Sequence, residues 1–108
     1  MLNMPDKATL TYTIAAVLHA ISLGHVYGYG VMEATGLPSG TVYPALGRLE
    51  RDALIVSRWE KHAMAEAAQR PARKYYKITR TGSSILKQAR EQYPLLAKIA
   101  PAVEVEQV

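Results

Sequence analysis

The chain of 108 residues contains no cysteine and no phenylalanine, and it has one tryptophan, Trp59. Without cysteine the protein forms no disulfide and offers no thiolate to a metal. Without phenylalanine, its core has to be built from aliphatic side chains and from some of its seven tyrosines. The lack of cysteine also fits a reducing compartment, so we expect a cytoplasmic protein.

Signals for membranes, metals and catalysis are missing as well. No apolar run approaches the roughly 20 residues of a membrane-spanning helix, and the N-terminus does not have the pattern of a signal peptide. The three histidines, His19, His25 and His62, are not spaced like metal ligands. No Ser/His/acid set, glycine-rich phosphate loop or paired carboxylates can be assembled from the motif spacing. We therefore expect no membrane partner, no cofactor and no enzymatic activity.

Length and charge indicate one small basic domain. A core of this size gives marginal stability, so self-association is expected on size grounds alone. Residues 48–80 carry nine basic and four acidic side chains, whereas the rest of the chain nets minus one. A basic field confined to one part of the chain is what a phosphate-binding surface requires, although an ordinary solvated surface has the same pattern.

Hydrophobic periodicity predicts three helices in the first half of the chain. The first runs from about residue 8 to 23, with apolar residues at one-face spacing, and Gly24 can end it. The second spans about residues 27 to 35 and is followed by a turn at Gly36-Leu37-Pro38. The third spans about residues 39 to 53. This order of a short helix, a turn and a second helix is typical of a helix-turn-helix.

The third helix has two unlike faces. Projection at 100° per residue places one apolar face toward a core, formed by Val42, Ala45, Leu46 and Leu49. The opposite face is small and basic, formed by Gly40, Pro44, Gly47 and Arg51 and flanked by Tyr43 and Arg48. A small face lets a helix enter a major groove about 12 Å wide, while Tyr and Arg reach phosphates or base edges. An ordinary capped core helix is the alternative.

Pro44 constrains where this helix begins, because it has no N–H to donate to the fourth residue before it. With Thr41 as N-cap, Pro44 falls at the third helical position, where its missing N–H is harmless. With Ser39 as N-cap, the carbonyl of Gly40 loses its partner. Both registers remain open at this point.

After Ala53 the apolar period changes to two. Residues 54–59 and 73–78 alternate as strands do, and the dozen residues between them predict an antiparallel pair with a long loop, the wing. The loop is rich in alanine and has no strand signal, so we expect it to be mobile or transiently helical. Arg70, Arg73 and Lys74 cluster at its return, where phosphate contacts explain them better than packing does.

These motifs resemble the PadR family, the phenolic-acid-decarboxylase repressors, a set of bacterial winged-helix regulators. The resemblance covers about residues 10 to 82 and is carried by G-Y-G-V-M-E, S-G-T-V-Y-P-A-L-G-R-L-E, L-I-V-S-R-W-E and R-P-A-R-K-Y-Y-K-I-T-R-T-G. It implies that Ser39, Gly40, Thr41, Tyr43, Pro44 and Arg48 lie on the recognition helix and that Arg73 and Lys74 belong to the wing strand. Many members have glycine where this chain has Ala53, which must avoid a positive φ or bear strain.

The C-terminal segment predicts association. Leu86, Ala89, Tyr93, Leu96 and Ala100 recur at the spacing of a helix-helix seam, although the stripe could equally pack on its own domain. Pro94 either kinks this helix or begins a second short one. The resemblance is to the short branch of the family, which implies dimerisation through this helix with help from the first. Relatives in that branch can bind flat aromatic compounds between subunits, and whether a small-molecule effector exists here stays open.

The sequence thus predicts a mostly helical α+β fold, a winged helix-turn-helix over residues 8–80, a dimerisation helix over 81–101 and a frayed tail over 102–108. We expect a homodimeric regulator that binds a palindromic operator in double-stranded DNA and acts as a repressor. Expected DNA contacts are Ser39, Gly40, Thr41, Tyr43, Pro44, Arg48, Arg51, Arg70, Arg73 and Lys74, and expected dimer contacts are Leu86, Ala89, Tyr93 and Leu96. The alternative is a winged-helix module that binds proteins and not DNA.

Overall fold

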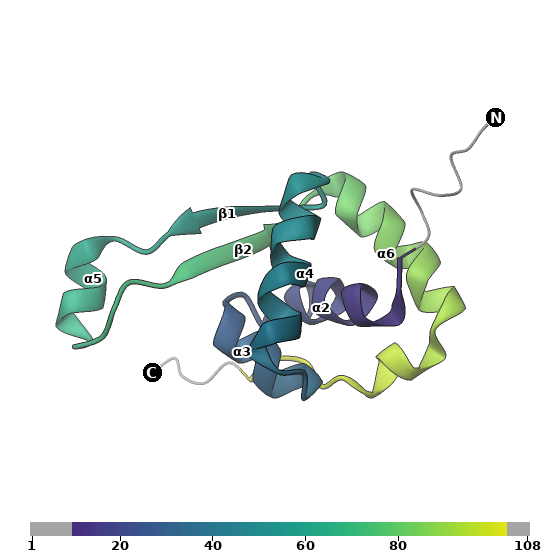
Figure 1. The fold of residues 1–108 in the computed structure, drawn as a ribbon, viewed down its shortest axis with the longest axis horizontal. Coiled ribbons are helices and arrows are strands. Elements are labelled where there is room, and N and C mark those ends of the chain that lie inside the picture. The colour runs from purple at the N-terminus through teal and green to yellow at the C-terminus, as the bar shows by residue number, and fades with distance from the viewer. Residues whose placement is uncertain (1–9, 104–108) are drawn as a thin grey trace.

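The computed structural model describes residues 10–103, and Figure 1 shows their arrangement. Its elements, in order, are α2 (Tyr12–Ser22), α3 (Gly28–Thr35), α4 (Ser39–Arg51), β1 (Ile55–Trp59), α5 (His62–Ala67), β2 (Lys74–Ile78), α6 (Arg80–Gln92) and the 3₁₀ helix η1 (Pro94–Lys98). The two strands form one antiparallel sheet. The predicted class, a mostly helical α+β fold with a winged helix-turn-helix, is confirmed.

Helix α2 is the centre of the core and contacts α3, α4, α6 and β2. It begins later than predicted, because Thr11 has extended backbone and its side-chain oxygen accepts a hydrogen bond from the Ile14 N–H as the N-cap. Leu10 therefore precedes the helix, although it is buried as expected. The first two residues of the predicted helix, 8 and 9, lie outside the described residues. At the other end Gly24 has a φ of 101°, as a C-terminal glycine should.

Helix α4 begins at Ser39, so neither predicted capping residue is its N-cap. The N-cap is Pro38, whose carbonyl accepts the N–H groups of Thr41 and Val42. Pro44 consequently lies inside the helix at its sixth residue, which corrects the expected third position. Its missing N–H leaves the Gly40 carbonyl without an intrahelical partner. Because Gly40 and Pro44 are both exposed, water can hydrate that carbonyl and the cost is small.

Ala53 does not avoid the positive φ that many family members accommodate with glycine. Its φ is 61°, so it adopts the left-handed conformation and bears the strain that glycine would avoid. The neighbouring Leu54 N–H donates to the carbonyl of Leu49, five residues earlier, which is the hydrogen bond of a Schellman helix end. This bond turns the chain from α4 directly into β1.

The sheet forms the wing, which projects away from the helices (Figure 1). The register pairs Ile55 with Ile78 at the base and Trp59 with Lys74 toward the tip. The loop between the strands contains a short helix, α5, in agreement with its alanine-rich sequence. Tyr27 forms an isolated bridge with Tyr75 on the free side of β2, which attaches the wing to the start of α3.

Most of the C-terminal stripe packs on its own domain, the alternative that its spacing left open, and dimerisation through this helix stays a prediction. Leu86, Ala89 and Leu96 are each about 1% exposed and belong to the core around α2. Tyr93 donates a hydrogen bond of 2.7 Å to the Leu10 carbonyl and stacks edge to face on Tyr12, at 5.5 Å between ring centroids. The side chains of Leu86, Ala89 and Leu96 are therefore covered by their own domain.

The path of the chain around Pro94 and Gly82 is also defined. Helix α6 ends at Gln92 and η1 begins at Pro94, so the second of the two predicted alternatives holds. Gly82 is required at the start of α6, because a Cβ there would collide with the Leu54 carbonyl oxygen. Beyond η1, the Ala102 N–H donates to the Leu23 carbonyl, so this residue of the expected frayed tail is held by the α2 end. Residues 104–108 lie outside the described residues.

The histidines have ordinary surroundings. His19 is buried on α2, and its pKa is lowered by desolvation and by the charge of Arg90. His25 makes a 2.7 Å hydrogen bond with the Ala100 carbonyl, and exposed His62 lies 3.9 Å from Glu66 on α5. Within residues 10–103, no helix combines the length and the apolar character needed to cross a membrane.

Candidate nucleic-acid interface

The outer face of α4 is the most distinctive surface of the molecule. Val42, Ala45, Leu46 and Leu49 are all buried, as the helical projection predicts. Every residue assigned to the opposite face and its edges is exposed: Gly40, Tyr43, Pro44, Gly47, Arg48 and Arg51, together with Ser39. Thr41 is half-buried. The face is therefore presented to solvent as a narrow ridge of small residues with larger side chains at its edges.

Gly40 and Gly47 on this face have no explanation inside the chain. A Cβ built on either residue meets no atom of residues 10–103 within 4 Å, and neither residue has a positive φ. A glycine inside a helix costs about 1 kcal/mol relative to alanine. The structure would therefore accept alanine at both positions, so the reason for glycine lies in what approaches the face from outside.

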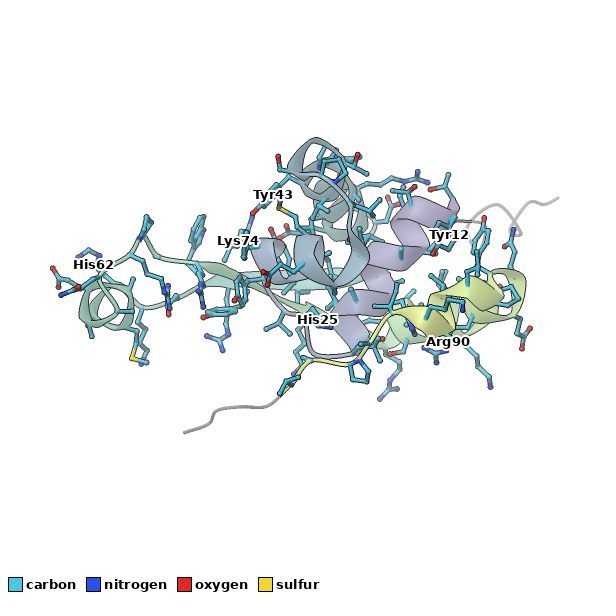
Figure 2. The ribbon with its side chains drawn as sticks, turned by 90° about the horizontal axis from the view of Figure 1, so that it is seen from below. Tyr12, His25, Tyr43, His62, Lys74 and Arg90 are labelled. Carbon is cyan, nitrogen blue, oxygen red and sulfur yellow. The ribbon has the colours of Figure 1, made fainter. Side chains whose placement is uncertain are left out.

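On the Tyr43 edge, a cleft of about 670 Å³ separates α4 from the wing and from the start of α3. Tyr29, Tyr43 and Trp59 line it and are 58%, 50% and 64% exposed. Tyr43 and Lys74 both line it, and they lie near each other in Figure 2. The ring of Tyr43 covers Gly28, where a Cβ would collide with it. The glycine of the G-Y-G motif thus makes room for the tyrosine of the recognition helix.

All three predicted wing cations, Arg70, Arg73 and Lys74, line this cleft. The guanidinium of Arg73 lies 4.0 Å from the centroid of the Tyr27 ring, which holds it at the cleft without neutralising it. The Lys74 ammonium lies 3.6 Å from a carboxylate oxygen of Glu50 and 5.9 Å from the ring centroids of both Trp59 and Tyr76. The positive charge of Arg73 is therefore not offset by its tyrosine contact, whereas that of Lys74 is partly offset by Glu50 of α4.

Arg70 has a different environment from the other two. Its guanidinium donates two hydrogen bonds to the Glu60 carboxylate, of 2.6 and 2.9 Å. Hydrogen bonding by Arg70 is the main reason that the pKa of Glu60 is lowered to about 2. The same carboxylate accepts from the Arg73 N–H at 3.2 Å. Arg70 and Glu60 thus tie the two sides of the wing together, and the pair is charged at neutral pH.

Glu50 is a site residue that the sequence did not single out. From the end of α4 it accepts a 2.5 Å hydrogen bond from the Ser57 hydroxyl on β1 and pairs with Lys74 on β2. It therefore sets the position of the wing relative to the recognition helix. Its place in R-L-E, two residues beyond the predicted contact Arg48, was the available signal. That signal did not reveal that Ser57 and Lys74 are its partners, because they depend on the strand register.

On the Arg48 edge, a second cleft of about 420 Å³ lies between α4 and the start of α2. Gly40, Thr41, Pro44, Arg48 and Arg51 line it from α4. Arg48 also lies 3.6 Å from Asp52 in an exposed pair one turn apart. The structure therefore brings the predicted residues of the recognition helix and wing to one side of the molecule, with a cleft on each edge of α4.

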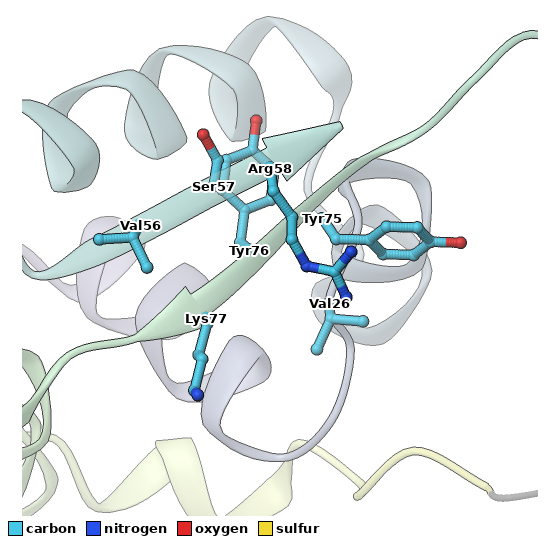
Figure 3. A pocket seen from close by; sticks show the side chains of 7 residues that line it. All are labelled: Val26, Val56, Ser57, Arg58, Tyr75, Tyr76 and Lys77. Atoms are coloured by element: carbon cyan, nitrogen blue, oxygen red, sulfur yellow. The ribbon is translucent and has the colours of Figure 1, made fainter. Parts of the chain in front are cut away.

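The opposite face of the wing sheet has a third hollow, of about 480 Å³. Figure 3 shows the side chains of Val26, Val56, Arg58, Tyr75 and Lys77 around it. Alternation along the strands sends these side chains away from α4, so this hollow does not belong to the surface formed by α4 and its two clefts.

Comparison with known proteins agrees with this geometry. Residues 17–88 match the model of the Transcriptional regulator PadR-like family, and this match runs from the middle of α2 through most of α6. No protein of curated function matches the sequence.

Solved structures with the same fold cover most of the chain. A PadR family transcription regulator from hypervirulent Clostridium difficile R20291 has a TM-score of 0.67 at 24% identity, covering 82% of this chain and 94% of that one. A transcriptional regulator from Clostridium thermocellum has a TM-score of 0.64 at 23% identity, covering 92% and 94%. A PadR-like transcriptional regulator from Bacillus cereus has a TM-score of 0.59 at 26% identity, covering 79% and 84%.

Proposed function

Because the chain belongs to the PadR-like family of transcriptional regulators, we propose that it binds a specific DNA site as a homodimer and represses transcription there. The observation that carries this proposal is the exposed face of α4, whose two glycines have no role inside the chain and whose edges carry tyrosine and arginine. A helix with such a face fits a major groove, where side chains at its edges reach bases and phosphates.

In this mode α4 enters the groove and the wing follows the backbone beside it. Ser39, Gly40, Thr41, Tyr43, Pro44, Arg48 and Arg51 contact DNA from α4. Arg73 and Lys74 contact phosphates from the wing. Arg70 acts through its bidentate pair with Glu60, which positions Arg73, since the Arg73 N–H shares that carboxylate. Mutation of Arg70 should therefore alter the structure of the wing more than it alters the positive charge available to DNA.

The small binding surface of one protomer supports a homodimer and a palindromic operator. One protomer presents one recognition helix and few free cations, whereas two related by a twofold axis read two half-sites about one helical turn apart. Residues 10–103 consist of the winged domain and the C-terminal segment packed on it. Repression by occupying promoter DNA in the cytoplasm needs nothing more than this binding surface.

Selection from random duplex DNA tests the proposal. We expect an inverted repeat to be enriched, and two protomers per site by sedimentation of the complex. Titration at two salt concentrations should show affinity that falls steeply with salt, as phosphate contacts require. Trp59, the single tryptophan, lines the wing cleft and reports binding directly through its fluorescence.

The same titration separates DNA binding from a protein-interaction role. A winged domain that only binds proteins would show no enriched sequence and no salt-dependent affinity for duplex DNA. Either result, obtained with folded protein, contradicts the proposed function.

Gly47→Ala is expected to stabilise the protein while weakening its DNA binding. Alanine relieves the backbone cost of glycine inside α4, by up to about 1 kcal/mol, and meets no atom of the chain. On the proposed groove-facing side, the added methyl group prevents α4 from entering the major groove to its full depth. Urea denaturation and DNA titration measure the two effects, with Gly36→Ala, strained at a φ of 75°, as a destabilised control away from this face. Unchanged DNA affinity in a stabilised Gly47→Ala protein would show that Gly47 does not face the groove.

A further inference from the structure

The cleft on the Arg48 edge of α4 has a second wall that no motif or comparison assigns to a ligand. Thr11, Thr13 and Ile14 form this wall, from the start of α2. Within residues 10–103, the lining of the cleft contains two arginines and three threonines and no carboxylate. Asp52 offsets part of the charge of Arg48 at 3.6 Å, whereas no ion pair within residues 10–103 holds Arg51. The cleft is therefore open to solvent and positively charged.

Two of its threonine hydroxyls, those of Thr11 and Thr13, donate no hydrogen bond within residues 10–103. Thr11 uses its side-chain oxygen as an acceptor for the Ile14 N–H, which leaves its own proton available. Thr13 is half-buried, and its hydroxyl makes no hydrogen bond to any group in residues 10–103. Hydroxyl and guanidinium donors facing one space suit an anion with several oxygen acceptors.

The position of this cleft relative to α4 indicates which anion it takes. Tyr43 and Arg48 are five residues apart, which separates them by about 140° around the helix. The wing cleft and this cleft therefore flank the groove-facing side of α4 on opposite edges. A helix about 10 Å wide in a groove about 12 Å wide has a phosphate strand on each edge.

We propose that the cleft between the start of α2 and α4 seats a phosphodiester of the strand opposite the wing, with Thr13 as a direct contact and Arg48 and Arg51 beside it. This assignment rests on the proposed function. It makes the start of α2 part of the DNA-binding surface, so the recognition helix is held between two phosphate contacts rather than steered by the wing alone.

Thr13→Glu tests the assignment without threatening the fold. Thr13 is the second residue of α2, where a carboxylate interacts favourably with the helix end, so the melting temperature should not fall. In the cleft the same carboxylate repels a phosphate, and we expect affinity for both operator and random duplex to fall by at least about 10-fold. Thr13→Val keeps the shape and removes only the hydroxyl, with an expected loss on the order of 10-fold or less.

Thr81→Glu is the matched control. Thr81 is exposed, is the second residue of α6 behind another threonine N-cap, and lines neither cleft beside α4. It should leave affinity as it is, apart from the small uniform effect of one added charge. If the unaltered protein binds DNA and Thr13→Glu binds as tightly as Thr81→Glu, the phosphate site is refuted while the proposed function stands. If the unaltered protein does not bind DNA, the proposed function itself fails.

Discussion

Leu86→Glu is expected to unfold the protein rather than to separate a dimer. Leu86 is about 1% exposed and packs in the core around α2. A carboxylate in that position loses its hydration and gains no partner, and such substitutions cost several kcal/mol, about 3 or more. A domain of this size has a free energy of unfolding of only about 5–10 kcal/mol, so most of its stability is lost. Thermal and urea denaturation followed by circular dichroism measure the change.

Leu95→Glu provides the matched control in the same C-terminal segment. Leu95 is 59% exposed on η1, so the same substitution there should change the free energy of unfolding by less than about 0.5 kcal/mol. Sedimentation of both variants completes the comparison. A Leu86→Glu protein that is fully folded and monomeric, beside a dimeric unaltered protein, would restore the stripe as the dimer interface.

Replacing Arg51 and Arg73 together with alanine is expected to cause the largest loss of DNA binding. Arg51 lies in the α2-side cleft and Arg73 in the wing cleft, so the variant removes one proposed phosphate contact on each edge of α4. We expect affinity to fall by at least about 100-fold, because hydrogen bonds to charged groups contribute about 1.5 kcal/mol or more each. Specific and random DNA should lose similar amounts, since phosphates carry no sequence information.

The salt dependence identifies the contacts as phosphate contacts. Each lost contact makes the slope of log affinity against log salt shallower by about 0.9, and a homodimer loses four. Lys77→Ala with Lys98→Ala is the control, since it removes the same charge from two exposed residues that line neither cleft. An unchanged slope in the arginine variant, or a loss confined to the operator, would show that these arginines do not bind phosphates. Thermal stability should stay within about 1 kcal/mol, because neither arginine is in an ion pair of the described chain.

The sequence by itself determined which residues of α4 face solvent. Helical geometry relates spacing directly to direction, so Val42 and Leu46 had to share one face and Gly40 and Gly47 the other, whatever the helix packed against. The alternation in the two strands and the turn at Pro38 are equally local properties. The family also followed from short motifs of adjacent residues. These local features were predicted correctly, whereas the N-cap of α4 and the position of Pro44 within the helix were not.

Only the tertiary structure decided which apolar surfaces meet and which charges remain free. The stripe that includes Leu86 and Leu96 is apolar at helical spacing whether it packs on α2 or on a second chain, so periodicity alone could not distinguish the two. Similarly, Arg70 and Arg73 have the same local sequence character. Glu60 pairs with Arg70 because the antiparallel register brings the two together across ten residues of chain, while Tyr27 holds Arg73 from a different element. Contacts between distant residues depend on the arrangement of whole elements, and the free energy that selects that arrangement is a property of the complete core.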